Sequence, residues 1–308
     1  FLLHHMVGSF NSQKKLFENI TCASIVLDDP ATAGYEIDRA IECLKHYKRP
    51  IYIELPRDVA KKSISYDVYK QGTPIAPATD PENLQESLKE VIEWLKEAKQ
   101  PAILAGVELA RYDLGERLIR FAERSNIPVA TTLLSKSVVD ERHPLFAGIY
   151  SGASSKETTR KIVEESDCLL MFGVMLTDVA LCFKPSKFKK RQVVSSSLDG
   201  LKIKNHTFTN IQFSDFCNSL FKLDVEKKPL PLMPEIKEKT VFEPKSDTKI
   251  TTSRLFEKID SILDKNIAIV ADIGDSLFGA ADLTVHNRNH FLSPAFYTSM
   301  GSAIPGAL

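Results

Sequence analysis

Helical apolar stripes alternate with short apolar runs through the middle of this chain, and this alternation constrains the fold more than any other feature. Residues 84–95 place apolar side chains on one face of a helix, and residues 101–106 then form a short apolar run. The same order returns at 114–122 and 128–131. Further helices are expected at 158–165 and 213–220, and further strands at 168–172 and 192–195. Alternation of this kind predicts an α/β fold with a doubly wound parallel sheet.

Two stretches without apolar periodicity divide the chain. Residues 63–79 contain two prolines and residues 226–250 contain four, so both stretches are predicted to be linkers. We therefore expect three pieces, at 1–62, 80–225 and 251–308. The chain opens inside an apolar run and closes on what reads as the start of a helix. These ends predict an internal piece of a longer enzyme, with its first and last domains truncated.

The outer pieces carry the same kinds of element as the middle. The first has a helical stripe at 31–44 and an alternating strand at 51–55, whereas residues 10–19 are a weaker helix candidate. The last piece has a helical stripe at 255–263 and a strand at 267–271. Both pieces are therefore expected to be parts of further α/β domains.

Charge and cysteine content exclude several classes of function. Lys plus Arg and Asp plus Glu both number 40, so the net charge is zero and no basic field attracts nucleic acid or an anionic membrane. No apolar run approaches the roughly 20 residues that span a bilayer. The five cysteines are scattered and form no C-x-x-C pair, which is typical of reduced thiols in the cytosol. We expect a cytoplasmic protein that binds neither nucleic acid nor membrane.

Two adjacent histidines, His4 and His5, follow three apolar residues at the start of the chain. If those residues end a buried strand, the histidines lie where α/β proteins place their chemistry. The pair could equally be a tag remnant or a metal-binding accident. Other histidines show no metal-ligand spacing: His143, His206, His286 and His290.

Gly274, Asp275 and Ser276 follow the expected strand at 267–271. Small residues at the start of a helix leave backbone N–H groups free, so this turn could hold a phosphate. An ordinary strand–helix turn, with Asp275 or Ser276 as the N-cap, fits the same residues. Residues 148–156 look only faintly like a phosphate loop, because their spacing departs from G-x-x-x-x-G-K-[ST] and no strand clearly precedes them. They are expected to be an ordinary loop.

Five stretches in order along the chain resemble the thiamine diphosphate-dependent 2-oxo acid decarboxylases of the pyruvate and indolepyruvate decarboxylase type. Residues 3–8 are similar to the family's paired-histidine motif, and residues 49–56 to the closing strand of its pyrimidine-binding domain. Residues 140–152 look like a loop of its middle domain. Residues 271–279 and 299–305 look like the start of its diphosphate-binding domain. The resemblance implies a three-domain architecture of parallel sheets flanked by helices.

The resemblance also implies roles for named residues. His4 and His5 would handle protons during decarboxylation and aldehyde release, since a histidine pKa lies near neutrality. The family builds each site between two chains, so a homodimer or homotetramer is implied, with the histidine pair facing Met300 of a partner.

The cofactor contacts follow from the same resemblance. Gly274, Asp275 and Ser276 would lie against the cofactor or its diphosphate. The carbonyl of Thr298 would accept a hydrogen bond from the cofactor's 4′-amino group, and Met300 would be the apolar wedge that bends the cofactor. Threonine at 298 departs from the glycine usual in the family.

The implied reaction is non-oxidative decarboxylation of a 2-oxo acid to an aldehyde, with thiamine diphosphate and Mg²⁺. The family's magnesium ligands and activating glutamate are expected outside this chain, so no metal ligand is assigned here. Two alternatives remain. One is an acetohydroxyacid synthase-like carboligase, a group that lacks the histidine pair and often holds FAD in its middle domain. The other is a non-catalytic nucleotide-binding α/β protein.

Overall fold

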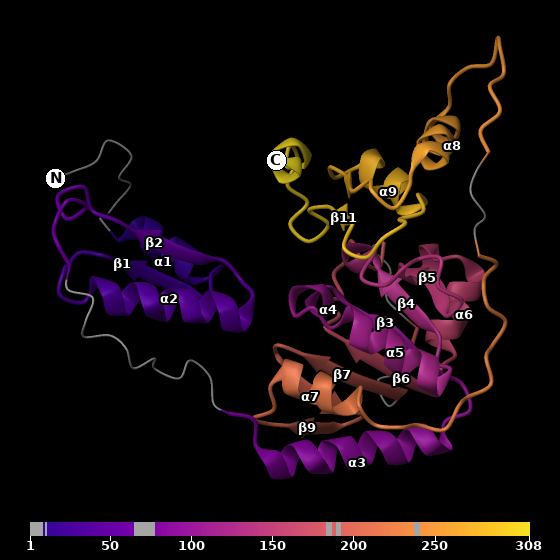
Figure 1. Cartoon of the computed structure of the whole chain (residues 1–308), viewed down its shortest axis with the longest axis horizontal. Coiled ribbons are helices and arrows are strands. Elements are labelled where there is room, and N and C mark those ends of the chain that lie inside the picture. Colours follow the sequence, from indigo (N-terminus) through magenta and orange to yellow (C-terminus); the bar gives the residue numbers. More distant parts are fainter. Residues whose placement is uncertain (1–8, 10, 65–77, 183–186, 189–191, 237–240) are drawn as a thin grey trace. The chain divides into compact units, whose positions relative to one another are not determined.

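The computed structural model describes residues 9, 11–64, 78–182, 187–188, 192–236 and 241–308. The chain forms two compact units, Phe1–Ala78 and Thr79–Leu308, and each is described by itself (Figure 1). The three-domain boundaries expected from the sequence stay a prediction.

The first unit holds a pair of parallel strands with helices beside them. Its elements are α1 (Ser12–Glu18), β1 (Ala23–Val26), α2 (Ala33–Tyr47) and β2 (Ile51–Glu54). Ala40 and Cys43 of α2 are buried with Ile25 of β1 in one apolar cluster. The predictions of α2 and β2 are confirmed, whereas α1 forms in a stretch that was only a weak helix candidate and β1 was not predicted.

Seven strands form the sheet of the second unit, in the order β5-β4-β3-β6-β7-β8-β9. Strands β3 to β7 pair in parallel, and β8 and β9 add an antiparallel edge beside β7. The strands are β3 (Pro101–Ala105), β4 (Val129–Thr132), β5 (Phe146–Tyr150), β6 (Cys168–Phe172), β7 (Val193–Ser197), β8 (Gly200–Ile203) and β9 (His206–Phe208). The helices are α3 (Pro81–Glu97), α4 (Val107–Arg111), α5 (Gly115–Ser125), α6 (Glu157–Glu164) and α7 (Phe213–Leu220), with short 3₁₀ turns at Leu133–Ser135 and Gly152–Ser154.

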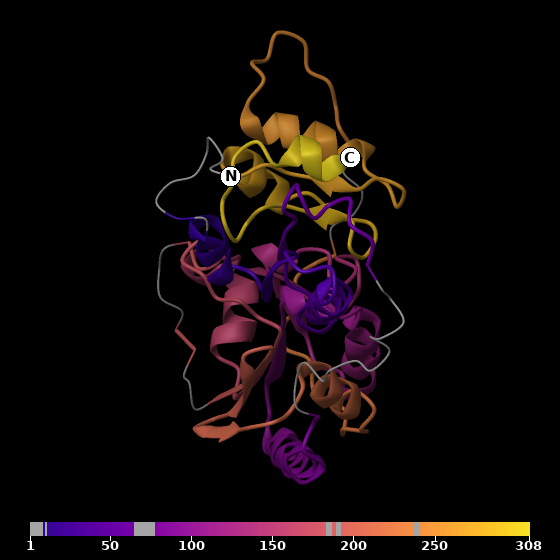
Figure 2. The same cartoon turned by 90° about the vertical axis from the view of Figure 1, so that its left-hand side faces the viewer.

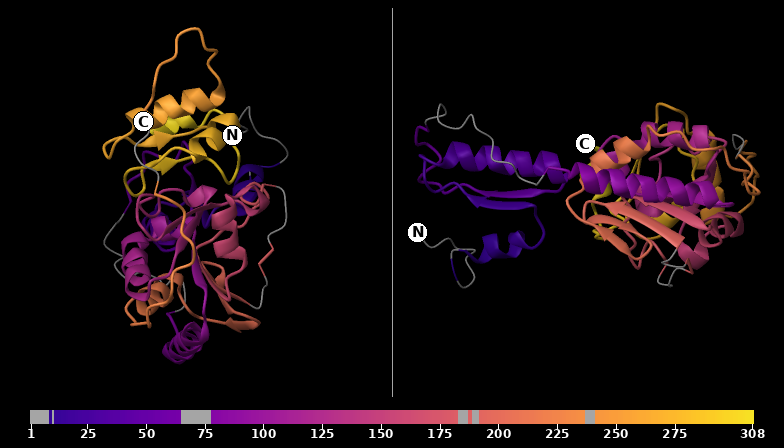
Figure 3. Two further views of the ribbon diagram at one scale, coloured as in Figure 1. Left: turned by 90° about the vertical axis from the view of Figure 1, so that its right-hand side faces the viewer. Right: turned by 90° about the horizontal axis from the view of Figure 1, so that it is seen from below.

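Helices cover both faces of this sheet, as Figure 2 shows. Ile103 of β3 packs with α3, α5 and α7 on one face, and Leu104 packs with α6 on the other. Figure 3 shows α3 along the edge formed by β8 and β9. A strand buried on both faces needs apolar residues at every position, which explains the unbroken apolar runs of the sequence.

The start of α3 confirms a specific prediction. The Asp80 carboxylate accepts hydrogen bonds from the backbone N–H of Glu82 at 2.9 Å and of Asn83 at 3.1 Å, with Pro81 in the first turn. These bonds satisfy donors that a helix start leaves without partners.

The sequence prediction was wrong at β5, because residues 146–150 form a strand that leads directly into the 148–156 stretch. Gly148 has a φ of 101°, and the register against β4 shifts by one residue beside it. A Cβ on Gly148 would lie 2.5 Å from the Thr159 hydroxyl. The glycine that suggests a loop is therefore the residue that allows a bulge within the strand.

The predicted parallel sheet is confirmed, and it also has an antiparallel edge, β8 and β9, that the sequence did not predict. Leu201 and Ile203 of β8 are buried while Lys202 between them is exposed, so this strand is covered on one face only. Gly200 has a φ of 132° and Lys204 a φ of 55°, and such residues turn the chain tightly enough for antiparallel hairpins. Residues 200–203 are too few and too polar to be predicted as a buried strand from the sequence.

Part of the predicted second linker packs against the sheet's helices. The Lys228 N–H donates to the Ser125 carbonyl at 2.9 Å, and the Lys228 ammonium donates to the Lys96 carbonyl at 3.0 Å. Asn126 donates to the Lys228 carbonyl at 2.7 Å. These bonds fix the linker near the ends of α3 and α5.

The end of the chain adds a two-stranded parallel sheet to the second unit. Its elements are α8 (Thr252–Ile262), β10 (Ile269–Val270), α9 (Asp275–Ala281), β11 (Phe291–Leu292) and α10 (Ala303–Ala307). The helix predicted at 255–263 is confirmed as α8, and the strand predicted at 267–271 is shorter, as β10.

Strand order in the large sheet reverses between β3 and β6, and this reversal is where doubly wound folds bind nucleotides. Gly106 follows β3 and Gly173 follows β6, and a Cβ on Gly106 would lie 1.9 Å from the Gly173 carbonyl oxygen. Glu108 is 1% exposed, and its carboxylate accepts from the Leu198 N–H at 2.9 Å. The chain itself therefore closes this crevice.

Replacing Gly106 by alanine should lower the free energy of unfolding by about 1–3 kcal/mol or more, because overpacking a tight site usually costs this much. Urea unfolding followed by circular dichroism measures this change. Gly306→Ala is the control, because its new Cβ would come no closer than 3.5 Å to its nearest neighbour, Leu292. An unchanged unfolding midpoint for Gly106→Ala would contradict the close contact.

Candidate functional site

The predicted site residues fall into two groups. His4 and His5 lie outside the described residues. The other five gather after the carboxyl ends of β10 and β11, two strands that pair in parallel: Gly274, Asp275, Ser276, Thr298 and Met300. Because the carboxyl ends of parallel strands share one edge of a sheet, this is a place where α/β proteins bind ligands.

The first segment is the turn from β10 into α9. Gly274 has a φ of 92°, and a Cβ placed on it would meet nothing within 4 Å. Asp275 and Ser276 are exposed in the first turn of α9, where backbone N–H groups have no acceptor within the helix. The Ser276 hydroxyl donates to the Asp272 carbonyl at 2.8 Å and so remains able to accept. The turn offers donors and open space to a bound anion.

The second segment, residues 298–301, is an exposed turn with unusual backbone. Thr298 has a φ of 54° and Gly301 a φ of 83°. A β-branched residue rarely adopts a positive φ, since its side chain crowds the backbone. The glycine that the family usually has at position 298 would adopt it freely. Met300 is 89% exposed, as the wedge role requires of a side chain that is to meet a ligand.

Asp272 joins the two segments, and sequence reasoning missed it. One carboxylate oxygen accepts from the Ile273 N–H at 2.8 Å, and the other accepts from the Gly301 N–H at 2.8 Å. An acidic residue directly after a strand was the available signal, but its partner lies 29 positions away in sequence. Nearby, the hydroxyls of Ser293 and Ser302 are buried without a partner among the described residues.

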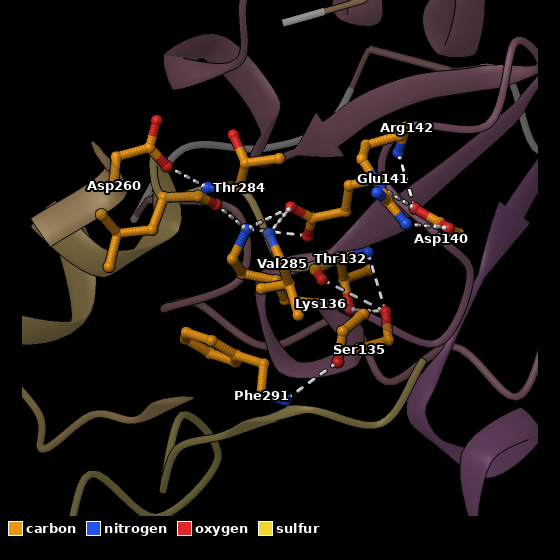
Figure 4. Close-up of polar contacts among 12 residues, drawn as sticks. Thr132, Ser135, Lys136, Asp140, Glu141, Arg142, Asp260, Thr284, Val285 and Phe291 are labelled. Atoms are coloured by element: carbon orange, nitrogen blue, oxygen red, sulfur yellow. Dashed lines mark hydrogen bonds and ion pairs between the residues drawn. The ribbon is translucent and has the colours of Figure 1, made fainter. Parts of the chain in front are cut away.

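A buried ion pair connects this part of the chain to the large sheet (Figure 4). The Lys136 ammonium lies 2.7 Å from the Glu141 carboxylate, and the two side chains are 1% and 6% exposed. Lys136 also donates to the Leu283 carbonyl at 2.8 Å, and Glu141 accepts from the Val285 N–H at 3.1 Å. The Lys136 and Glu141 side chains thus each form a hydrogen bond with the backbone of residues 283–285, in addition to their ion pair.

Further hydrogen bonds in the same area fix the chain from His286 to Phe291, the first residue of β11. The Ser137 carbonyl accepts from the Asn289 N–H at 2.8 Å, and its hydroxyl accepts from the Phe291 N–H at 3.1 Å. Arg142 donates to the His286 carbonyl at 3.0 Å. Residues 140–152 resemble only a middle-domain loop in sequence, yet the start of this loop holds residues 285 and 286, which lie before β11.

A cavity of about 280 Å³ lies between the same two parts of the second unit. Its lining includes Leu133, Glu141, Lys156, Phe278 and Asp282, a mixture of apolar and oppositely charged groups. None of the five predicted cofactor residues lines it. The cavity is therefore separate from the candidate site.

Comparison with known proteins matches the middle of the chain to one family. Residues 88–219 match the family described as "Thiamine pyrophosphate enzyme, central domain". Pyruvate decarboxylase from Candida glabrata is 28% identical over 97% of this chain, and indole-3-pyruvate decarboxylase from Azospirillum brasilense is 26% identical over 100% of it. The middle of the chain is therefore similar to the central domain of thiamine pyrophosphate enzymes, and nearly the whole chain is similar to 2-oxo acid decarboxylases.

The match to these relatives is partial in length. The chain spans 54% of the Candida glabrata relative and 56% of the Azospirillum brasilense relative. Benzoylformate decarboxylase from Polynucleobacter necessarius has a similar fold, with a TM-score of 0.68 and 18% identity over 94% of this chain and 55% of its own. This chain therefore shares its mostly parallel α/β fold with that structure.

Metal clusters, membrane-spanning helices and reactive cysteines are three further features by which the described residues bear on chemistry. Among the described residues, no three His, Cys, Asp or Glu side chains group closely enough to hold a metal ion. No helix in the described ranges has the length and apolarity to cross a bilayer. Burial raises the pKa of Cys168 to about 12, so its thiol stays protonated at neutral pH and is no nucleophile.

Replacing Lys136 by methionine should cost about 3–5 kcal/mol of unfolding free energy, because Glu141 would keep a buried charge without its partner. Adding Glu141→Leu should recover part of that loss. Lys161→Met is the matched control, since its ion pair with Glu157 is exposed and should leave stability nearly unchanged. Urea unfolding of the four proteins distinguishes these outcomes, and equal losses for Lys136→Met and Lys161→Met would contradict the role of the buried pair.

Proposed function

We propose that the complete protein decarboxylates a 2-oxo acid to an aldehyde with thiamine diphosphate and Mg²⁺. The observation that carries this proposal is the gathering of five predicted cofactor residues at one sheet edge, with Thr298 in a conformation that suits the family's usual glycine. Relatives named pyruvate decarboxylase and indole-3-pyruvate decarboxylase support pyruvate or indolepyruvate as the substrate, and phenylpyruvate is proposed as a third candidate of the same type.

The residues present fit the diphosphate end of the cofactor. The backbone N–H groups of Asp275 and Ser276 would bind its oxygens, and Gly274 leaves the space open. The Asp275 carboxylate would repel a diphosphate unless a cation lay between them, which supports the proposed Mg²⁺. The ligands of that ion are proposed to lie outside this chain.

The other end of the cofactor would meet residues 298–300. The Thr298 carbonyl would accept from the 4′-amino group, and the exposed Met300 would support the bent cofactor through its long, unbranched side chain. When bound, the cofactor supplies the electron sink for the carbanion left by loss of carbon dioxide. His4 and His5 would donate and accept the protons, which suits a side chain whose pKa lies near neutrality.

We further propose a homodimer or homotetramer in which the histidine pair of one copy faces Met300 of another. The proposed location is the cytoplasm, a choice supported by the scattered cysteines and zero net charge. No contact with nucleic acid or membrane is proposed.

The two alternatives are weaker for a specific reason. A nucleotide or FAD in the middle domain would be expected at the reversal of strand order. There Gly106 packs on Gly173, and the buried Glu108 bonds the Leu198 N–H. The filled crevice disfavours a nucleotide-binding protein and an FAD-containing carboligase.

The complete protein should release aldehyde from a 2-oxo acid only when both thiamine diphosphate and Mg²⁺ are present. Protein stripped with a chelator and dialysed should lose turnover, and adding both together should restore it. A coupled assay with an aldehyde reductase measures this for pyruvate, phenylpyruvate and indolepyruvate. Equal turnover without thiamine diphosphate would overturn the proposed function.

His4→Ala or His5→Ala in the complete protein should lower turnover by roughly 10²–10⁴, the usual contribution of a positioned acid or base. Binding of thiamine diphosphate, measured by calorimetry, should stay unchanged because neither side chain is proposed to hold it. His206→Ala is the control, since this exposed histidine lies in the edge strand β9 beside Glu90. If both site variants kept full turnover, the pair would have no catalytic role.

A further inference from the structure

We propose that Asp272 is a positioning residue, which holds the turn at 298–301 against the turn at 274–276 and so sets the distance between the two halves of the cofactor site. The inference rests on the proposed function and adds to it a residue that touches neither substrate nor reacting atoms. It predicts that cofactor affinity depends on a carboxylate outside the contact set Gly274, Asp275, Ser276, Thr298 and Met300.

The contacts of Asp272 point in both directions. Its carbonyl accepts from the Ser276 hydroxyl at 2.8 Å and its carboxylate accepts from the Ile273 N–H at 2.8 Å, so it is fixed within the first turn. The second carboxylate oxygen accepts from the Gly301 N–H at 2.8 Å. A hydrogen bond to an ionised acceptor is stronger than one between neutral groups, so this bond can hold a turn in place.

The turn at 298–301 needs such a bond because packing does not hold it. Tyr297 is 69% exposed and Met300 89% exposed. Thr298 carries an unfavourable positive φ, and strained backbone persists only where its surroundings impose it. The Thr298 N–H donates to the Pro294 carbonyl at 2.8 Å on one side, and Gly301 bonds Asp272 on the other. The strained residue is thus fixed on both sides.

Loss of the carboxylate should let Thr298 relax to a negative φ in most molecules. A ligand that binds only the strained form then has a lower apparent affinity, because only the fraction of molecules that keep this form can bind it. We expect Asp272→Ala in the complete protein to weaken thiamine diphosphate binding roughly tenfold or more, as loss of one charge-assisted bond implies. Asp264→Ala is the matched control, since Asp264 accepts from the Asn266 N–H at 2.7 Å in an ordinary local turn.

Thr298→Gly separates positioning from a general loss of structure. The single variant removes the β-branched side chain that makes the positive φ costly, and its measured affinity is the reference for the double variant. Combined with Asp272→Ala it should recover part of the lost affinity, since glycine adopts a positive φ without crowding. A residue that only stabilised the fold would give no such recovery.

Two measurements on the complete protein test the proposal. Calorimetry with thiamine diphosphate and Mg²⁺ gives the affinity of each variant, and hydrogen exchange without cofactor follows the amide of Gly301. We expect faster exchange at Gly301 in Asp272→Ala but not in Asp264→Ala, with equal melting temperatures. Unchanged affinity and unchanged exchange in a folded Asp272→Ala would overturn the inference.

The remaining outcomes are also decisive. If Asp272→Ala does not fold, Asp272→Asn tests the same point, because its amide offers one acceptor oxygen for two N–H groups. Wild-type affinity and wild-type exchange in Asp272→Asn would overturn the inference. If the wild-type protein fails to bind thiamine diphosphate, the proposed function is wrong, and the hydrogen exchange of Gly301 still tests the contact with Asp272.

Discussion

The ion pair between Lys136 and Glu141 fixes the 283–285 segment of the second unit against the large sheet. Buried charges are costly to desolvate, and these two are compensated by each other and by the backbone of residues 283–285. The pair therefore specifies one placement of that segment against the large sheet, because a shifted segment would leave a charge without its bonds. Phe291 is held by Ser137 in the same area, so the placement extends to β11 and the candidate site.

Much of the fold could be predicted because burial leaves a local pattern. The stripe at 84–95 and the apolar run at 101–106 are such patterns, and α3 and β3 form there. β5 was missed because Gly148 combines a bulge with buried packing, which a linear pattern cannot separate from a loop. The antiparallel edge was missed because β8 is covered on one face only.

Some residues of the candidate site could be predicted from the sequence and others could not. Gly274, Ser276 and Met300 could be proposed from short motifs, since each motif lies within a few consecutive residues. Asp272 and Lys136 could not, because their partners are distant in sequence and become neighbours only on folding. Thr298 stands where the family usually has glycine, and its positive φ is unfavourable for a β-branched residue. This cost of the replacement is seen in the backbone angle and not in the sequence.

The packing of Lys228 has a consequence for how the second unit assembles. Its bonds to the carbonyls of Ser125 and Lys96 fix the chain well before α8 begins at Thr252. Only about two dozen residues then tether the last segment to the sheet, and a tether of that length gives a local concentration on the order of millimolar. Docking at Lys136 is consequently an intramolecular event. An interface too weak to hold two separate proteins together can remain closed here.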